Sequence, residues 1–144
     1  MKKHLLQAAE RGNAEAQFNL GIMCENGWDD SRYVVEGSRR EARKWFTAAA
    51  ERGLPRAQIK LAEIYAGEAD IPGNNVKACG WYLLATDHLV GMPRQRAQTA
   101  CERVASRLTP VELETAQGFA RDWKAMRSDA ADLDARELLA EGAP

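Results

Sequence analysis

One string of residues occurs twice in this chain, and this repetition constrains the fold more than any other feature. The pattern A-A-E-R-G-x-x-x-A-Q-x-x-L occupies residues 8–20 and again residues 49–61. Gly12 and Gly53 mark the same point in the two copies, 41 residues apart. A weaker third copy follows at residues 96–101. Chance does not readily supply such a string twice, so the chain is predicted to be an array of stacked structural repeats.

Each copy has the hydrophobic spacing of two helices. Apolar residues at intervals of three and four predict helices over residues 14–26 and 39–52 in the first copy. In the second copy, Pro55 suits the first turn of a helix over 55–66. Asn74 or Asn75 is expected to cap the next helix, which runs to about Leu89. Gly91-Met92-Pro93 is expected to break the chain before helices over 94–107 and 110–127, the last opened by a capping box of Thr109 and Glu112. No segment alternates with period two, so the chain is predicted to be all-α.

The helices predict one solenoid domain over residues 1–127, a short right-handed stack of antiparallel helix pairs. Its parts are an outer half-repeat (1–12), repeat one (13–53), repeat two (54–91) and a degenerate third pair (92–127). Small residues are expected where helices cross most closely, at Ala16, Ala42, Ala57 and Ala78. Residues 128–144 carry five acidic side chains against Arg136 alone. This segment is predicted to be either a short capping helix or a frayed acidic tail.

Composition excludes several function classes. Twenty Lys and Arg against 21 Asp and Glu give a net charge of −1, which argues against a nucleic-acid binder. No apolar stretch is long enough to span a membrane. The odd number of cysteines, Cys24, Cys79 and Cys101, favours three small buried side chains in a reducing compartment over a disulfide framework. We therefore expect a cytoplasmic monomer without metal or cofactor, with a periplasmic or secreted location open if a leader precedes the sequence.

The repeat itself resembles a known family. Ala14-Glu15-Ala16-Gln17, Leu20-Gly21, Met23 and Gly27, followed by Trp45-Phe46, Ala49-Ala50-Glu51 and Gly53, are similar to the Sel-1-like repeat, a relative of the tetratricopeptide repeat. The resemblance covers about residues 5 to 90. Ala62 and Cys24 depart from it, as does an enlarged loop at residues 28–38. The resemblance implies a bacterial adaptor that binds proteins without chemistry of its own.

In tetratricopeptide-like solenoids, the first helix of each pair lines a concave surface. Carried over to this chain, that rule predicts a groove that binds a protein or peptide partner. Its residues are Glu15, Phe18, Asn19 and Ile22 from the first copy, Arg56, Ile59 and Lys60 from the second, and Arg96, Arg103 and Arg107 from the third. The arginines favour a partner with an acidic segment or a C-terminal carboxylate. The alternative is that these charges simply face water.

A search for catalytic motifs finds none. The sequence contains no G-x-S-x-G turn, no S-x-x-K box and no phosphate-binding glycine loop. Hydrolysis of a β-lactam or cell-wall substrate therefore rests on the resemblance alone, and a regulatory or immunity partner of a cognate effector is a second alternative. Trp45, Trp81, Tyr82 and Trp123 are expected to fill the core rather than form a binding platform. Trp28 and Tyr33 lie in the enlarged loop, which is either a contact surface or folds back on repeat one.

Overall fold

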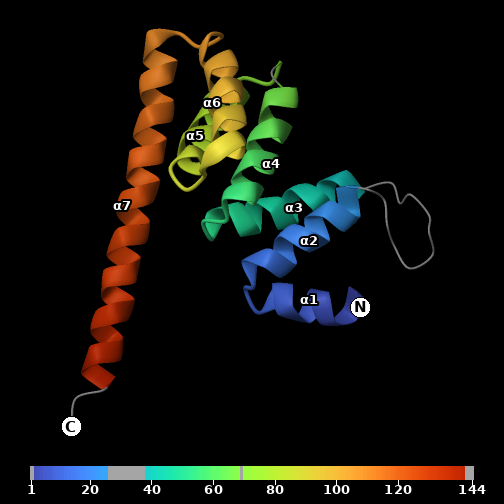
Figure 1. The fold of residues 1–144 in the computed structure, drawn as a ribbon, viewed down its shortest axis with the longest axis vertical. Coiled ribbons are helices and arrows are strands. Elements are labelled where there is room, and N and C mark those ends of the chain that lie inside the picture. The colour runs from blue at the N-terminus through green and yellow to red at the C-terminus, as the bar shows by residue number, and fades with distance from the viewer. Residues whose placement is uncertain (1, 26–37, 69, 142–144) are drawn as a thin grey trace.

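The computed structural model describes residues 2–25, 38–68 and 70–141, and in these ranges the chain contains seven helices and no strand (Figure 1). They are α1 (Lys2–Glu10), α2 (Ala14–Glu25), α3 (Ser38–Glu51), α4 (Pro55–Gly67), α5 (Asn74–Thr86), α6 (Gly91–Ala105) and α7 (Pro110–Glu141). The prediction of an all-α helical repeat solenoid is confirmed. The predictions for Gly27, Trp28 and Tyr33 fall outside the described residues.

The turns that lead into α2 and α4 have the same geometry because both copies place a glycine there. Gly12 and Gly53 have φ values of 92° and 93°, a left-handed conformation that other residues adopt only with strain. The side-chain oxygen of Asn13 then accepts a hydrogen bond from the N–H of Ala16 at 3.0 Å, which caps α2. In the second copy, Pro55 opens α4 as expected.

Small residues allow the helices of each pair to lie close together. Ala16, Ala42, Ala57 and Ala78 are all buried, as predicted. At Gly21 a Cβ atom would lie only 2.6 Å from the ring of Phe46 on α3. Packing therefore requires glycine at this position, since an added methyl group would displace the ring.

The glutamine of the repeated Ala-Gln pair joins successive helices. The amide nitrogen of Gln17 donates to the carbonyl oxygen of Ala9 at 3.0 Å, and that of Gln58 donates to Ala50 at 3.2 Å. Both glutamines are buried. Each of these carbonyl oxygens already accepts a hydrogen bond from the N–H of the turn glycine, Gly12 or Gly53, at 3.0 Å. The glutamine eight residues further along the chain supplies a second donor to the same oxygen, and so links the two helices.

The two helices of the third pair do not pack along each other as the helices of the first two pairs do. α6 packs against α5, and α7 also packs against α5 instead of lying along α6 (Figure 1). α7 continues past residue 127 to Glu141. No helix therefore ends at residue 127, where we predicted the end of the solenoid domain. The segment from 128 to 141 extends α7 and is not a separate helix folded over the last pair.

Both boundaries of α5 and the start of α6 also differ from the predictions. The N-cap of α5 is Gly73, at φ 85°, while the side chain of Asn74 donates instead to the carbonyl oxygen of Glu68 at 3.1 Å. α5 ends at Thr86, before Leu89. Gly91-Met92-Pro93 does not break the chain but forms the first turn of α6. Proline is tolerated there because N–H groups in a first turn lack helical partners.

The aromatic residues fill the core, as predicted. Trp81 and Tyr82 are buried, and Trp45 and Trp123 are partly buried against core residues. The ring of Trp81 meets Phe119 edge to face at 5.4 Å between centroids and Trp123 at 6.2 Å. These contacts fix α7 on α5. Cys79 and Cys101 are buried, whereas Cys24 is only half-buried.

Candidate functional site

A cavity of about 350 Å³ opens between α2, α4, α5 and α6. We call it the α4–α6 groove, because these two helices supply most of its walls. Its lining consists of Phe18 from α2, Arg56, Ile59, Lys60 and Glu63 from α4, Tyr82 from α5, Leu89, and Pro93, Arg96, Ala97 and Ala100 from α6. Since α2, α4 and α6 are the first helices of their pairs, the cavity lies on the face predicted from the repeat.

Half of the predicted groove residues line this cavity: Phe18, Arg56, Ile59, Lys60 and Arg96. Asn19 and Ile22 instead line a different cavity of about 730 Å³ between α1 and α2. Glu15 lines neither cavity and forms an ion pair with Arg56.

Arg103 and Arg107 do not line the groove. Arg103 is two helical turns beyond Arg96, about 10 Å along the helix axis. Arg107 follows the last residue of α6, Ala105, and so no longer shares the helix face. Of the three arginines expected from the third copy, only Arg96 therefore lines the α4–α6 groove.

Acidic residues of the first copy balance two of the groove's cations. Arg56 pairs with Glu15 at 2.5 Å and also lies over the ring of Phe18, 5.0 Å from its centroid. Lys60 pairs with Glu25 at 3.3 Å. Arg96 forms no ion pair with any residue that the structure describes. The groove is therefore less basic than the sequence alone predicts, and Arg96 is its available cation.

Tyr82 is the groove residue that sequence reasoning assigned only to the core. Its side chain is 4% exposed, yet it reaches the cavity, and its hydroxyl forms no hydrogen bond within the described part of the chain. Burial raises the pKa of Tyr82, and the nearby carboxylate of Glu63 raises it further. The hydroxyl therefore stays protonated at neutral pH and can donate a hydrogen bond to a bound group.

Leu89, Pro93 and Ala97 were also missing from the predicted groove. The expected break at residues 91–93 removed Pro93 from α6. Leu89 was expected at the end of a helix and instead lies in the turn between α5 and α6. Because α6 starts at Gly91, Pro93 belongs to the same helix as Arg96 and Ala97, and all three line the cavity.

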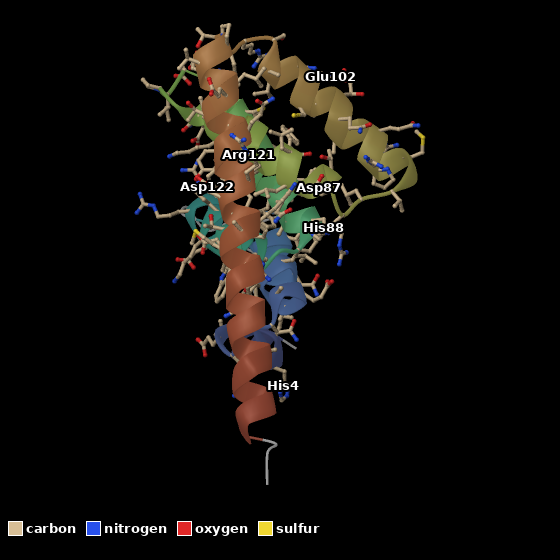
Figure 2. All side chains as sticks on the ribbon, turned by 90° about the vertical axis from the view of Figure 1, so that its left-hand side faces the viewer. His4, Asp87, His88, Glu102, Arg121 and Asp122 are labelled. Carbon is tan, nitrogen blue, oxygen red and sulfur yellow. The ribbon has the colours of Figure 1, made fainter. Side chains whose placement is uncertain are left out.

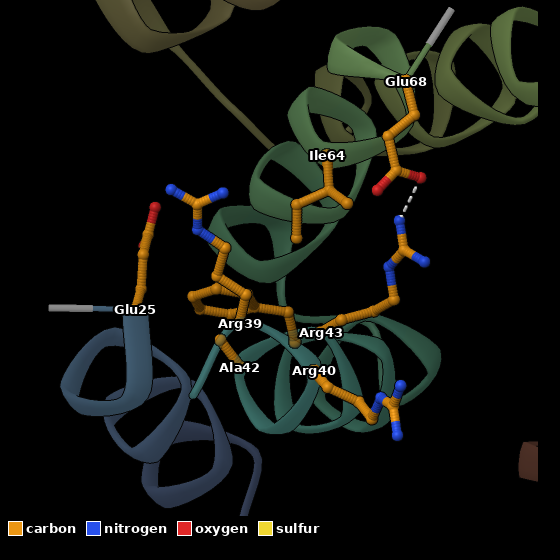
Figure 3. Close-up of a pocket in the computed structure, with 8 residues that line it drawn as sticks. Glu25, Arg39, Arg40, Ala42, Arg43, Ile64 and Glu68 are labelled. Carbon is orange, nitrogen blue, oxygen red and sulfur yellow. Dashed lines mark hydrogen bonds and ion pairs between the residues drawn. The ribbon is translucent and has the colours of Figure 1, made fainter. Parts of the chain in front are cut away.

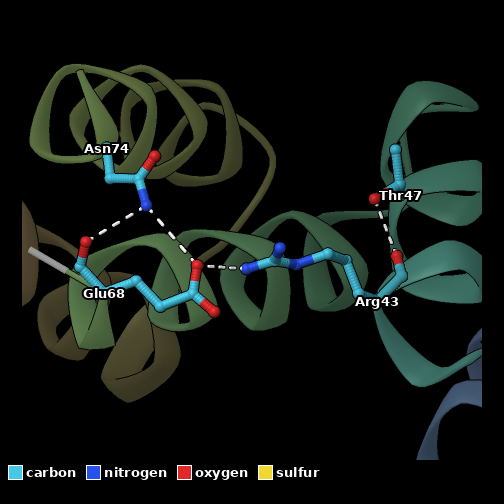
Figure 4. A network of polar contacts seen from close by, with 4 residues as sticks. All are labelled: Arg43, Thr47, Glu68 and Asn74. Carbon is cyan, nitrogen blue, oxygen red and sulfur yellow. Dashed lines mark hydrogen bonds and ion pairs between the residues drawn. The ribbon is translucent and has the colours of Figure 1, made fainter. Parts of the chain in front are cut away.

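A second charged cavity, of about 310 Å³, lies between α2, α3 and α4 (Figure 3). The side chain of Arg39 extends toward that of Glu25, and Arg43 forms an ion pair with Glu68. The same carboxylate lies 3.5 Å from the side-chain nitrogen of Asn74, and the Thr47 hydroxyl donates to the carbonyl oxygen of Arg43 at 2.7 Å (Figure 4). This network links α3, α5 and the end of α4, so Arg43 contributes to the packing of the stack.

The described residues give no sign of a metal site. They contain no group of three or more His, Cys, Asp or Glu side chains placed to hold an ion. His4 lies on α1, far from His88, which neighbours Asp87 at the end of α5 (Figure 2). Over the same residues, no helix is both long and apolar enough to cross a bilayer.

Comparison with known proteins agrees with this architecture. Residues 14–54 and 55–88 each match the Sel1 repeat. The crystal structure of c5321, a protective antigen present in uropathogenic Escherichia coli strains that displays an SLR fold, is similar with a TM-score of 0.70. The two sequences are 26% identical, over 95% of this chain and 28% of that one, so this chain spans less than a third of that protein. No curated protein matches the sequence. Because the two repeat matches cover more than half of its residues, the chain belongs to the Sel1 repeat family.

Proposed function

We propose that this chain is a protein-binding module that holds an extended segment of its partner in the α4–α6 groove. Sel1 repeats are protein-interaction modules, which supports a binding role in general. One observation carries the choice of this groove. It combines an apolar surface with three polar groups that have no partner in the described chain: the guanidinium of Arg96, the carboxylate of Glu63 and the hydroxyl of Tyr82.

The dimensions of the groove fit side chains of a peptide. Its volume of about 350 Å³ is at the lower end of the range of roughly 300–1,000 Å³ found for ligand pockets. Phe18 and Ile59 offer apolar contact, so an aliphatic or aromatic side chain is expected between α2 and α4. A neighbouring carboxylate of the partner would meet Arg96, whose planar guanidinium binds carboxylates through two parallel hydrogen bonds.

A defined peptide pair tests this proposal. Fluorescein-labelled decapeptides that alternate Asp with Leu or Phe are compared with matched peptides that carry Lys in place of Asp, using fluorescence anisotropy. We expect the acidic peptides to bind and the basic ones to fail. Binding should weaken as salt rises, because the Debye length shortens from about 10 Å at 0.1 M to about 3 Å at 1 M.

Arg107 provides the matched control, since it is an exposed arginine outside the groove. Arg96→Glu should weaken acidic peptide binding at least about tenfold, because it replaces attraction by repulsion. Arg107→Glu should leave binding unchanged. Equal affinities of the two variants would place the binding surface elsewhere and overturn the proposal.

The partner's identity separates the possible roles. Parallel capture from a lysate with the wild type, Arg96→Glu and Arg107→Glu, followed by mass spectrometry, identifies proteins that need the groove. A captured enzyme or toxin that loses activity on binding indicates a neutralising partner, and a captured assembly component indicates an adaptor. Covalent labelling by a fluorescent penicillin would instead support the hydrolase alternative.

A further inference from the structure

Two buried thiols face each other where α6 packs on α5. The sulfur atoms of Cys79 and Cys101 are 3.8 Å apart, and the Cys101 sulfur also lies 4.0 Å from the carbonyl oxygen of Cys79. Cys79 is fully buried and Cys101 is 9% exposed. A disulfide requires a sulfur separation of about 2.05 Å. The two atoms must therefore approach by less than about 2 Å to bond.

We propose that Cys79 and Cys101 form a reversible disulfide when the chain meets hydrogen peroxide, and that this bond fastens α6 to α5. α6 carries Pro93, Arg96 and Ala97 of the α4–α6 groove, so the bond would hold one wall of that groove in place. This last consequence rests on the proposed function, whereas the formation of the bond does not.

The packing of α6 explains why such a bond would matter. α5 is packed by α4, α6 and α7, but α6 has its main contacts with α5 alone. The stripe of α6 beside its contact with α5 carries exposed residues, among them Gln98 and Glu102. A helix supported on one side separates from its neighbour more easily than one enclosed on two. Such separation admits a small oxidant to the thiol pair, and the bond that forms then prevents it.

The hydrogen bonding of the pair indicates which sulfur reacts first. The hydrogen bond from Cys101 lowers the pKa of the Cys79 thiol. The same contact raises the pKa of Cys101, and burial raises it further. The thiolate is the nucleophilic form of cysteine, so Cys79 is the expected site of attack on the peroxide.

The reaction balances with one molecule of peroxide. The Cys79 thiolate attacks one peroxide oxygen, the O–O bond breaks, and the leaving hydroxide takes up a proton to become water. The sulfur of Cys101 then attacks the sulfenic sulfur of Cys79, so that the S–S bond forms and the S–O bond breaks. The departing hydroxide takes the thiol proton of Cys101. Two thiols are thus oxidised and one peroxide is reduced to two waters.

The experiment treats the folded, full-length chain with hydrogen peroxide, blocks remaining thiols with N-ethylmaleimide under denaturing conditions, and maps the peptides by mass spectrometry. We expect a peptide pair joined through Cys79 and Cys101, with Cys24 still able to react with the blocking reagent. Dithiothreitol should reverse the bond. Closing this loop should raise Tm by roughly 10 °C, because the bond restricts the unfolded chain.

Three serine variants serve as matched controls. Cys24→Ser should retain both the cross-link and the rise in Tm, while Cys79→Ser and Cys101→Ser should each lose both. If either core variant fails to fold, the peptide map of the Cys24→Ser variant still decides. The proposal is overturned if peroxide oxidises Cys24 while Cys79 and Cys101 both remain blockable, or if the cross-link joins another pair. Peptide anisotropy on the oxidised chain tests the effect on the groove separately, so loss of peptide binding by the reduced chain would count only against the proposed function.

Discussion

The inner helices α2 and α4 differ from α6 at two equivalent positions. Gln17 and Gln58 are buried and bond to the preceding helix, whereas Gln98, at the same place in the third copy, is exposed. One helical turn further on, Gly21 and Ala62 are buried, and the third copy has the exposed residue Glu102. All three helices bury the remaining positions of their common face, which include Leu20, Leu61 and Cys101.

This difference shows that a complete repeat buries two adjacent stripes on its first helix. The stripe that contains Gln17 and Gly21 contacts both neighbours: Gln17 bonds to the preceding helix, and Gly21 lies against Phe46 on the second helix of the same pair. A glutamate at this place requires solvent, since burying an unpaired carboxylate is costly. Glu102 thus accounts for the open third pair. α7 packs instead on α5, where Gly80 leaves room for the ring of Phe119. A Cβ atom added to Gly80 would lie only 2.5 Å from that ring.

The largest expected effect comes from moving this glutamate into a complete repeat. Ala62→Glu places a carboxylate at a position with no solvent exposure, between α4 and α5. We expect a loss of about 3–5 kcal/mol in the free energy of unfolding. Glu102→Ala, the converse change, should cost nothing. Urea unfolding followed by circular dichroism measures both, and equal effects would show that the two sites are alike.

A second substitution tests the glutamine contact. Gln58→Ala removes the hydrogen bond to Ala50 and leaves a cavity. It breaks no second hydrogen bond, because the amide oxygen of Gln58 has no partner among the described residues. The expected cost is therefore moderate, about 2 kcal/mol. Gln98→Ala should stay within about 0.5 kcal/mol of the wild type, because that side chain is exposed. Thermal unfolding of the two variants provides the comparison, and a large loss for Gln98→Ala would contradict it.

A third prediction concerns the start of α7. Thr109 and Glu112 each accept a hydrogen bond from the other's backbone N–H, at 3.2 and 3.1 Å, which is the predicted capping box. Thr109→Ala should destabilise the chain by about 1 kcal/mol, and Thr109→Ser should restore most of that. Denaturant midpoints measure the difference. If Thr109→Ala leaves the denaturant midpoint unchanged, packing on α5 alone determines where α7 begins.

The smallest effect concerns the ion pair that joins the first two repeats. Glu15 and Arg56 are more than half exposed, so solvent screens their attraction. A double-mutant cycle with Glu15→Gln and Arg56→Gln should give a coupling energy of about 0.5 kcal/mol that falls in high salt. A coupling that does not respond to salt would contradict a surface ion pair.

Most of the fold was predictable because it depends on local signals that recur. The Gly12 and Gly53 turns, the Ala-Gln pair and the capping box at Thr109 each specify their own geometry. The open third pair was missed, although Glu102 carried the signal in the place of a small residue. The start of α5 was misjudged because Gly73, with positive φ, stands at the N-cap in place of Asn74 or Asn75. The start of α6 was misjudged because Gly91-Met92-Pro93 forms its first turn instead of a break.

The groove was only half predictable, for a physical reason. The rule carried over from the repeat selected Phe18, Ile59 and Arg96, and these three side chains line one cavity. It does not specify how far a cavity extends along α6, and Arg103, two helical turns beyond Arg96, is not part of the lining. Nor does it show that Glu15 and Glu25 neutralise cations of the next repeat, since side-chain reach depends on the packed structure. Tyr82 was assigned to the core correctly, but it also lines the cavity.

The side chain of Arg127 gives the stack a connection that neighbouring repeats alone do not provide. It donates to the carbonyl oxygen of Glu51, in the last turn of α3, at 2.8 Å, across 76 residues of sequence. In a simple solenoid each repeat contacts only its neighbours, so unfolding can spread one repeat at a time. Here the last helix is tied to the first repeat, so loss of α7 also removes a cation from the carbonyl end of α3. Unfolding of α7 is therefore expected to weaken the end of α3 as well.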